Sequence, residues 1–193
     1  MALTADKFIL PDGPPVEGAQ PTSSSSLGPP DLWDFGSIDY ADLATQSTPF
    51  AITGGAGYVP IPNDGAGVNG YSNPPSGVTN VWDVATQAFD FTELSIGDMI
   101  DIRLDMQITT TATNQEYDIV LELGQGVSAY QIPFAVKSNV KTAGAVFVNR
   151  YNGIYIGNAL TLDNPGQFKI QSTANATLQV NGWYCKVIKK GRV

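Results

Sequence analysis

The fold is decided by the stretch Ile100-Asp101-Ile102-Arg103-Leu104-Asp105-Met106-Gln107-Ile108, in which five apolar residues alternate with four polar ones. Successive side chains of a β-strand point to opposite faces, so this pattern gives one apolar face and one polar face. The alternation recurs at residues 117–123 and 130–136, where Pro133 indicates an edge position or a bulge. These stretches predict strands that each bury one side.

Shorter strand candidates lie on both sides of this region, separated by turn-forming sequences. They are residues 50–53, 78–84, 89–92, 145–150, 154–156 with 160–162, 167–171, 177–180 and 183–188. Asn152-Gly153 and Asn181-Gly182 match two-residue hairpin turns. Residues 37–44 are expected to form one or two helical turns with Ser37 as the N-cap. Roughly nine to eleven short strands without a long helix predict an all-β fold, an antiparallel jelly-roll-like β-sandwich.

An extended Pro-rich N-terminal arm is expected over residues 1–35, followed by the sandwich domain over residues 36–193. Residues 11–30 contain six prolines, three glycines and a run of four serines. This composition cannot pack a core of its own and is typical of an extended linker.

Apolar residues flank this linker on both sides and are candidate anchors for a partner. They are Phe8, Ile9, Leu10, Trp33 and Phe35. Large apolar side chains make efficient anchors because they bury much surface for few lost rotamers. The alternative is that Trp33 and Phe35 cap the core of their own domain.

Charge is distributed unevenly along the chain. Residues 1–102 carry thirteen Asp and Glu against the single cation Lys7, whereas residues 103–193 carry nine Lys and Arg against five acids. The acidic half disfavours nucleic-acid binding. The cations near the C-terminus, Lys189, Lys190 and Arg192, are candidates for contacts between copies, and a solubilising chain end is the alternative.

Most of the residues that catalysis requires are missing. The sequence has no histidine, which excludes Ser-His-Asp and Cys-His arrangements and the HExxH zinc helix. The single cysteine, Cys185, lies in an apolar strand and is expected to be a buried, inert thiol. Residues 65–70 match the GxGxxG spacing, but no strand precedes them and no helix follows, so a Gly-rich loop is predicted.

Carboxylates are the remaining candidates for catalytic or metal-binding groups. Asp101 and Asp105 flank Arg103 on one strand face, which favours a neutralised ion-pair row over a glycosidase pair. A surface Ca²⁺ site that includes Asp64, Asp98 or Asp163 has no supporting ligand spacing. The sequence therefore predicts no enzymatic activity and no cofactor. No stretch approaches 18 apolar residues, and the N-terminus lacks a signal-peptide core, so we expect no membrane span and folding in a cytoplasm.

Two segments resemble virion structural proteins of tailed bacteriophages. They are Phe89-Asp90-Phe91-Thr92-Glu93-Leu94-Ser95-Ile96-Gly97-Asp98 and the closing Asn181-Gly182-Trp183-Tyr184-Cys185-Lys186-Val187. The group has TNF/C1q-like jelly rolls and includes capsid decoration (cement) proteins and head or tail fibre domains. The resemblance covers roughly residues 49–193 and is one of overall style, without a diagnostic motif.

This resemblance implies a homotrimer, a position in the virion, assembly in the bacterial host cytoplasm, and an N-terminal arm that docks the module onto the major capsid protein or another virion protein. It brings no catalytic residues. The alternative is a fibre or receptor-binding module that recognises host surface glycans through the loop tyrosines Tyr58, Tyr71, Tyr151 and Tyr155. Neither interpretation involves nucleic acid or a membrane.

Overall fold

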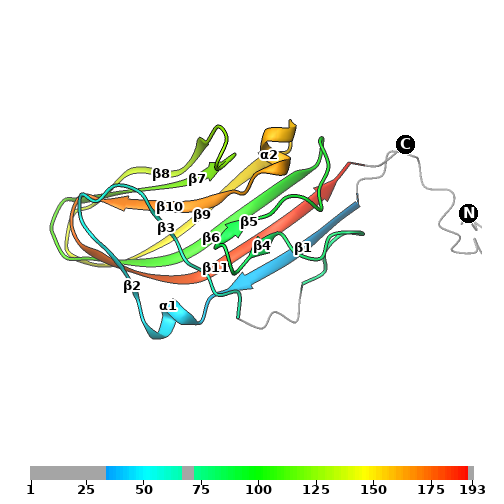
Figure 1. Cartoon of the computed structure of the whole chain (residues 1–193). Helices are drawn as coiled ribbons and strands as arrows, with labels where there is room; N and C mark the ends of the chain where they lie inside the picture. The colour runs from blue at the N-terminus through cyan, green and yellow to red at the C-terminus, as the bar shows by residue number, and fades with distance from the viewer. Residues whose placement is uncertain (1–33, 67–71, 191–193) are drawn as a thin grey trace, which may run out of the picture.

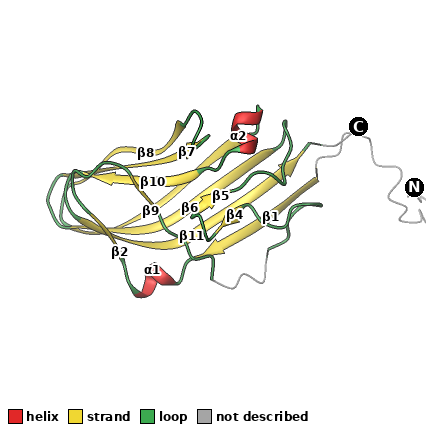
Figure 2. Ribbon diagram, viewed as in Figure 1, coloured by secondary structure: helices red, strands yellow, loops and turns green. Residues whose placement is uncertain are grey.

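The structure, a computed structural model, describes residues 34–66 and 72–190. These residues form eleven strands and two short helices, and most of the strands belong to two facing sheets (Figures 1 and 2). The elements are β1 (Asp34–Ala41), α1 (Ala44–Ser47), β2 (Phe50–Ile52), β3 (Val59–Pro60), β4 (Trp82–Asp83), β5 (Ala88–Phe89), β6 (Met99–Thr110), β7 (Gln115–Leu123), β8 (Tyr130–Val140), β9 (Gly144–Tyr155), α2 (Ala159–Asp163), β10 (Gln167–Ser172) and β11 (Ala176–Lys189).

All strand pairs are antiparallel. Sheet A has the order β1-β11-β6-β9, with β2 also paired to β11, and sheet B has the order β3-β10-β7-β8. The pair β4-β5 forms a separate small ribbon. Strands that neighbour each other in space but not in sequence, such as β11 between β1 and β6, are the Greek-key arrangement of a jelly roll. The predicted all-β jelly-roll-like sandwich is therefore confirmed. Residues 1–33 of the predicted arm lie outside the described residues, and its last two residues, Asp34 and Phe35, belong to β1 and not to an arm.

The core lies between the inward faces of the two sheets. The alternate residues of β6 from Ile100 to Ile108 are buried, and they face buried residues of β7 and β10. Aromatic rings fill the centre: Trp82 packs edge-on against Trp183 at 4.6 Å between ring centroids, and Phe168 lies 5.4 Å from Trp183. Burying such a side chain contributes roughly 1.5–3 kcal/mol, so this cluster is a main source of stability.

The strands predicted from alternation are confirmed. Residues 100–108 lie in β6, residues 117–123 in β7 and residues 130–136 in β8. Both expectations for Pro133 are met. It lies in β8, which is an edge strand, and the β7–β8 ladder has an irregularity opposite it, between Ile119 and Val120. A proline cannot donate to a central ladder, and an edge strand with a bulge removes that need.

The helix predicted over residues 37–44 is wrong. Residues up to Ala41 belong to β1, which pairs with β11 along its full length, and the only helical turn nearby is α1. Gly36, Ile38 and Tyr40 are buried while the residues between them are more exposed, which is the period of a strand. Pairing with a long central strand overrides the weak helical preference of this segment.

Both predicted Asn-Gly hairpin turns are also wrong. Asn152 and Gly153 lie inside β9, and Asn181 and Gly182 lie inside β11. Each strand pairs with the 12-residue β6, and this long ladder continues through the local turn sequence. Residues 160–162, expected as a strand, form helix α2, which Asn158 caps by accepting a hydrogen bond from the Thr161 backbone N–H at 2.9 Å.

Candidate binding surface

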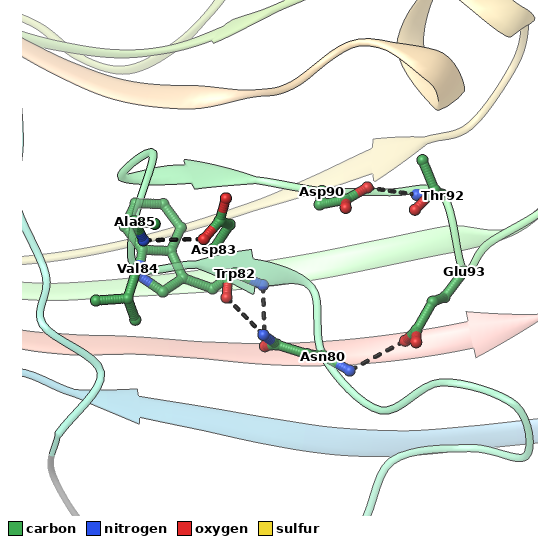
Figure 3. Close-up of a pocket in the computed structure, with 8 residues that line it drawn as sticks. All are labelled: Asn80, Trp82, Asp83, Val84, Ala85, Asp90, Thr92 and Glu93. Atoms are coloured by element: carbon green, nitrogen blue, oxygen red, sulfur yellow. Dashed lines mark hydrogen bonds between the residues drawn. The ribbon is translucent and has the colours of Figure 1, made fainter.

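A polar hollow of about 590 Å³ opens beside the β4–β5 ribbon (Figure 3). It is lined by Asn80, Trp82, Asp83, Val84, Ala85, Asp90, Thr92 and Glu93. Three carboxylates in one hollow are the feature that would matter for acid–base chemistry, so their hydrogen bonds decide what the hollow does.

Each of these carboxylates holds its own loop. Asp83 accepts hydrogen bonds from the Ala85 N–H at 2.9 Å and the Thr86 hydroxyl at 2.7 Å, and Asp90 accepts one from a backbone N–H (Figure 3). Glu93 accepts three, from the hydroxyl and N–H of residue 79 and the N–H of residue 80. The hydrogen bond from Thr86 lowers the pKa of Asp83, and the hydrogen bond from the hydroxyl of Thr79 lowers the pKa of Glu93. The hollow thus contains carboxylates that stabilise their own turns, and the described residues include no cluster suited to a metal ion.

The outer face of sheet A, turned away from sheet B, carries the main exposed apolar surface. The strand register places Phe35 of β1, Ile188 of β11, Met99 of β6 and Tyr155 of β9 side by side in one line across the sheet. We call these four residues the apolar row. Phe35 is 66% exposed and Tyr155 60% exposed. Neighbouring strands are about 4.8 Å apart, so the row spans roughly 14 Å.

Charged and aromatic groups occupy the middle of the same face. Arg103 Nε donates to Asp105 Oδ2 at 2.8 Å, and the Arg103 guanidinium lies 5.5 Å from the centre of the Tyr184 ring. A hydrogen bond with Asp101 raises the pKa of Tyr151 to about 12. The predicted ion-pair row is therefore present between Arg103 and Asp105, whereas Asp101 interacts with a tyrosine.

The predicted arm anchors are only partly visible. Phe8, Ile9, Leu10 and Trp33 lie outside the described residues. Phe35 is a residue of β1, where it projects from the outer face of sheet A, away from the core. The Lys186 ammonium lies over its ring, 5.6 Å from the centre. The exposure of Phe35 does not fit a core cap, and its role as an anchor stays a prediction.

The C-terminal cations are partly engaged by contacts within the same chain. Lys189 ends β11, and its ammonium donates to the Ser76 carbonyl at 2.9 Å. The Lys190 backbone N–H donates to Asp98 Oδ1 at 2.8 Å, while its side chain is exposed. Arg192 lies outside the described residues.

The remaining sequence candidates are scattered. Tyr151 and Tyr155 are exposed on β9, Tyr58 is half-buried near sheet B, and Tyr71 lies outside the described residues, as does most of the Gly-rich loop at 65–70. Cys185 is fully buried, and burial raises the pKa of its thiol, as the inert-thiol prediction requires. Among the described residues, no helix has the length and apolar character needed to cross a bilayer.

The sequence interpretation did not find the apolar row or the exposed Phe147 of β9. Ile188 and Met99 belong to recognisable strands, but their position in one line depends on the register of four strands. Phe147 lies in a strand that the sequence predicts, but its neighbours Val146 and Val148 are also apolar. The pattern therefore does not say which side of the strand faces solvent.

No protein-family model matches the chain, and no curated protein matches it in sequence. Among solved structures it is similar to a chain of the infectious bursal disease virus Gx strain, with 11% identity and a TM-score of 0.44 over 84% of this chain and 33% of that chain. It is also similar to the CBM22-1 xylan-binding domain of Paenibacillus barcinonensis Xyn10C (13% identity, TM-score 0.38, 79% of this chain and 93% of that one). A third similarity is to Eiger TNF from S. frugiperda (8% identity, TM-score 0.33, 83% and 94%).

These similarities are too distant to assign a family or a ligand. The chain spans about a third of the length of the viral chain it matches. The fold assignment therefore depends on the strand order and register of this chain itself.

Proposed function

We propose that this protein is a virion structural protein, a capsid decoration (cement) protein of a bacteriophage. Its N-terminal arm binds the major capsid protein or another virion protein, and its β domain forms a homotrimer. The observation that carries the proposal is the apolar row on the outer face of sheet A. Phe35 and Tyr155 at the two ends of the row are exposed, and Ile188 and Met99 between them are half-buried. Exposed apolar patches of this kind mark interaction surfaces.

The position of the row connects the two parts of the proposal. Phe35 belongs both to the row and to the segment that leaves the sheet towards residues 1–33. A subunit contact over the row therefore brings the arms of neighbouring copies together at one end of the sheet. Several arms acting on one particle bind far more tightly than one, because each bound arm raises the effective concentration of the others.

The carboxylates beside β4–β5 are engaged by their own loops, and Cys185 is buried without a basic partner. A decoration protein requires shape, exposed contact surface and stability, and no reactive group.

Two measurements on the full chain test the proposal. Light scattering after size exclusion should give three times the 20.5 kDa chain mass. The double variant Phe35→Ser with Tyr155→Ser should lower that mass, and Phe147→Ser, on the same face outside the row, should not. A wild-type monomer would contradict the trimer.

Particle binding is tested separately. Purified protein should bind expanded capsids that lack it, and deletion of residues 1–33, which leaves β1 intact, should abolish binding while the trimer persists. Equal binding without residues 1–33 would contradict the role of the arm.

A fibre or receptor-binding module that recognises host glycans is the second candidate, favoured by the exposed Tyr151 and Tyr155 on β9. Its location discriminates between the two: immunogold labelling of intact virions should mark the capsid surface for a decoration protein and the tail or its fibres for a receptor-binding module.

A further inference from the structure

A second feature of the outer face of sheet A lies at the bulge in β11. Val180 pairs with Met106 and Gly182 pairs with Asp105, so Asn181 is an extra residue with no partner in β6. Its backbone carbonyl accepts a hydrogen bond from the Asp42 N–H at 3.2 Å. Its side chain is exposed and makes no hydrogen bond within the described part of the chain. Bulges redirect side chains and are frequent beside functional sites.

The bulge opens a hollow of about 280 Å³ in the sheet face. It is lined by Asp105, Met106, Phe147, Val148, Asn149 and Asn181. Gly182 adds no side chain to this region, and any Cβ there would overlap the carbonyl oxygen of Tyr40. Pockets for drug-sized ligands measure about 300–1,000 Å³, so this hollow suits one small ring.

The polar groups of the hollow are fixed and nearly neutral in total charge. Asp105 accepts one hydrogen bond from Arg103 Nε at 2.8 Å and another from the Asn149 amide nitrogen. Arg103 neutralises the carboxylate, and these contacts fix its direction. The amide oxygen of Asn149 and the whole amide of Asn181 have no hydrogen-bond partner among the described residues, so they are available to a ligand.

One wall of the hollow is an uncovered aromatic ring. Phe147 is 76% exposed, and its cross-strand neighbour on β6 is the polar Gln107. An aromatic ring beside amide and carboxylate groups suits a ligand with one apolar face and a polar edge. A pyranose ring has this character, because its C–H groups form an apolar face and its hydroxyl groups both donate and accept hydrogen bonds.

We propose that this hollow binds one ring of an uncharged saccharide. The apolar face of the sugar packs on Phe147, its hydroxyl groups donate to Asp105 and Asn149, and the Asn181 amide donates to a sugar oxygen. The hollow offers little electrostatic attraction to a charged ligand, because its one carboxylate, Asp105, is already paired with Arg103. Phe147 lies eight residues along β9 from Tyr155, about 27 Å at strand spacing, so the site is separate from the apolar row and does not depend on the proposed capsid role.

Saturation-transfer difference NMR on the full-length protein tests this inference. The probes are methyl glycosides of glucose, galactose, mannose, N-acetylglucosamine and rhamnose, with sialic acid and glucuronic acid as charged probes. At least one neutral glycoside should give a saturable signal that exceeds the signal of either acid. Phe147→Ala should weaken it at least tenfold, and Asn181→Ala several-fold.

The control is Val127→Ala, which removes an exposed apolar side chain outside both the hollow and the apolar row and should leave saccharide binding unchanged. Circular dichroism checks that each variant is folded, as expected for exposed positions. The inference is overturned if no neutral glycoside gives a saturable signal, if an acidic sugar binds better, or if Phe147→Ala binds like the wild type. Loss of saccharide binding with intact particle binding would separate this site from the capsid function.

Discussion

Replacing Trp82 by Phe is expected to destabilise the protein more than the same replacement at Trp183, although both indoles are buried in one aromatic cluster. The difference lies in their N–H groups. Trp82 Nε1 donates to the carbonyl oxygen of Asn63 at 3.1 Å, and Asn63 is itself fully buried. Trp183 Nε1 is buried without a hydrogen-bond partner among the described residues.

The magnitude follows from what each variant leaves behind. Both replacements remove the same atoms from one packed cluster, so the packing loss largely cancels in the comparison. Trp82→Phe leaves the Asn63 carbonyl unpaired in the core, which costs about 1–3 kcal/mol. Trp183→Phe removes an unpaired donor and recovers a similar cost of desolvation. We therefore expect Trp82→Phe to be less stable than Trp183→Phe by the sum of the two effects, about 2–6 kcal/mol.

Urea unfolding followed by far-ultraviolet circular dichroism measures this difference without relying on tryptophan fluorescence, which each variant alters. Protein concentration must be held fixed, because subunit association would add to the apparent stability. Equal destabilisation would refute the reasoning and would mean that a ring face of the cluster already satisfies the Trp183 N–H. A less stable Trp183→Phe would refute it more strongly.

Three further predictions concern single positions. Gly182→Ala should lower the free energy of unfolding in urea by about 3 kcal/mol or more, because the added methyl group overlaps Tyr40. Gly126 also has a positive φ but faces open space, so Gly126→Ala should lower it by roughly 1–2 kcal/mol. Equal losses would contradict the close approach of Tyr40 to Gly182. The folded-state pKa of Glu93 is lowered by hydrogen bonds, so its stabilisation is present above its ordinary pKa of 4.5 and is lost as pH falls through the folded value. The Tm of Glu93→Gln should therefore fall less than the Tm of the wild type as the pH is lowered. Parallel plots of Tm against pH would argue against this. Cys185 should react with a thiol reagent only on unfolding, because it is fully buried with a raised pKa, and rapid labelling of native protein would contradict that burial.

The sequence predicts the central strands well because their period-two pattern reflects burial of one side. This holds for β6 and β7, where almost every inward residue is apolar and every outward residue of β6 except Met99 is polar. It fails at Asn152-Gly153 and Asn181-Gly182, where a local turn preference competes with a ladder to β6 formed by residues far away in the chain. Long-range pairing decides these positions, and a single sequence does not display it.

The candidate surfaces are less predictable than the strands. The apolar row requires the register of β1, β11, β6 and β9, and a shift of one residue in any strand would turn its member towards the core. The hollow requires the bulge at Asn181, which in the sequence resembles a hairpin turn. Gly182 has a φ of 143°, which favours glycine, and its missing side chain lets β1 approach closely.

The register of β1 with β11 has a practical consequence for display of foreign peptides. Asp34 lies opposite Lys189, so the two ends of the described domain leave sheet A at the same place, next to the segment that carries the proposed attachment to the particle. An antigen attached directly at either end of the described domain would emerge there, where a particle surface would crowd it. The exposed β8–β9 turn, residues 141–143, lies at the other end of the 12-residue β6, about 36 Å away at strand spacing, and is the better insertion point.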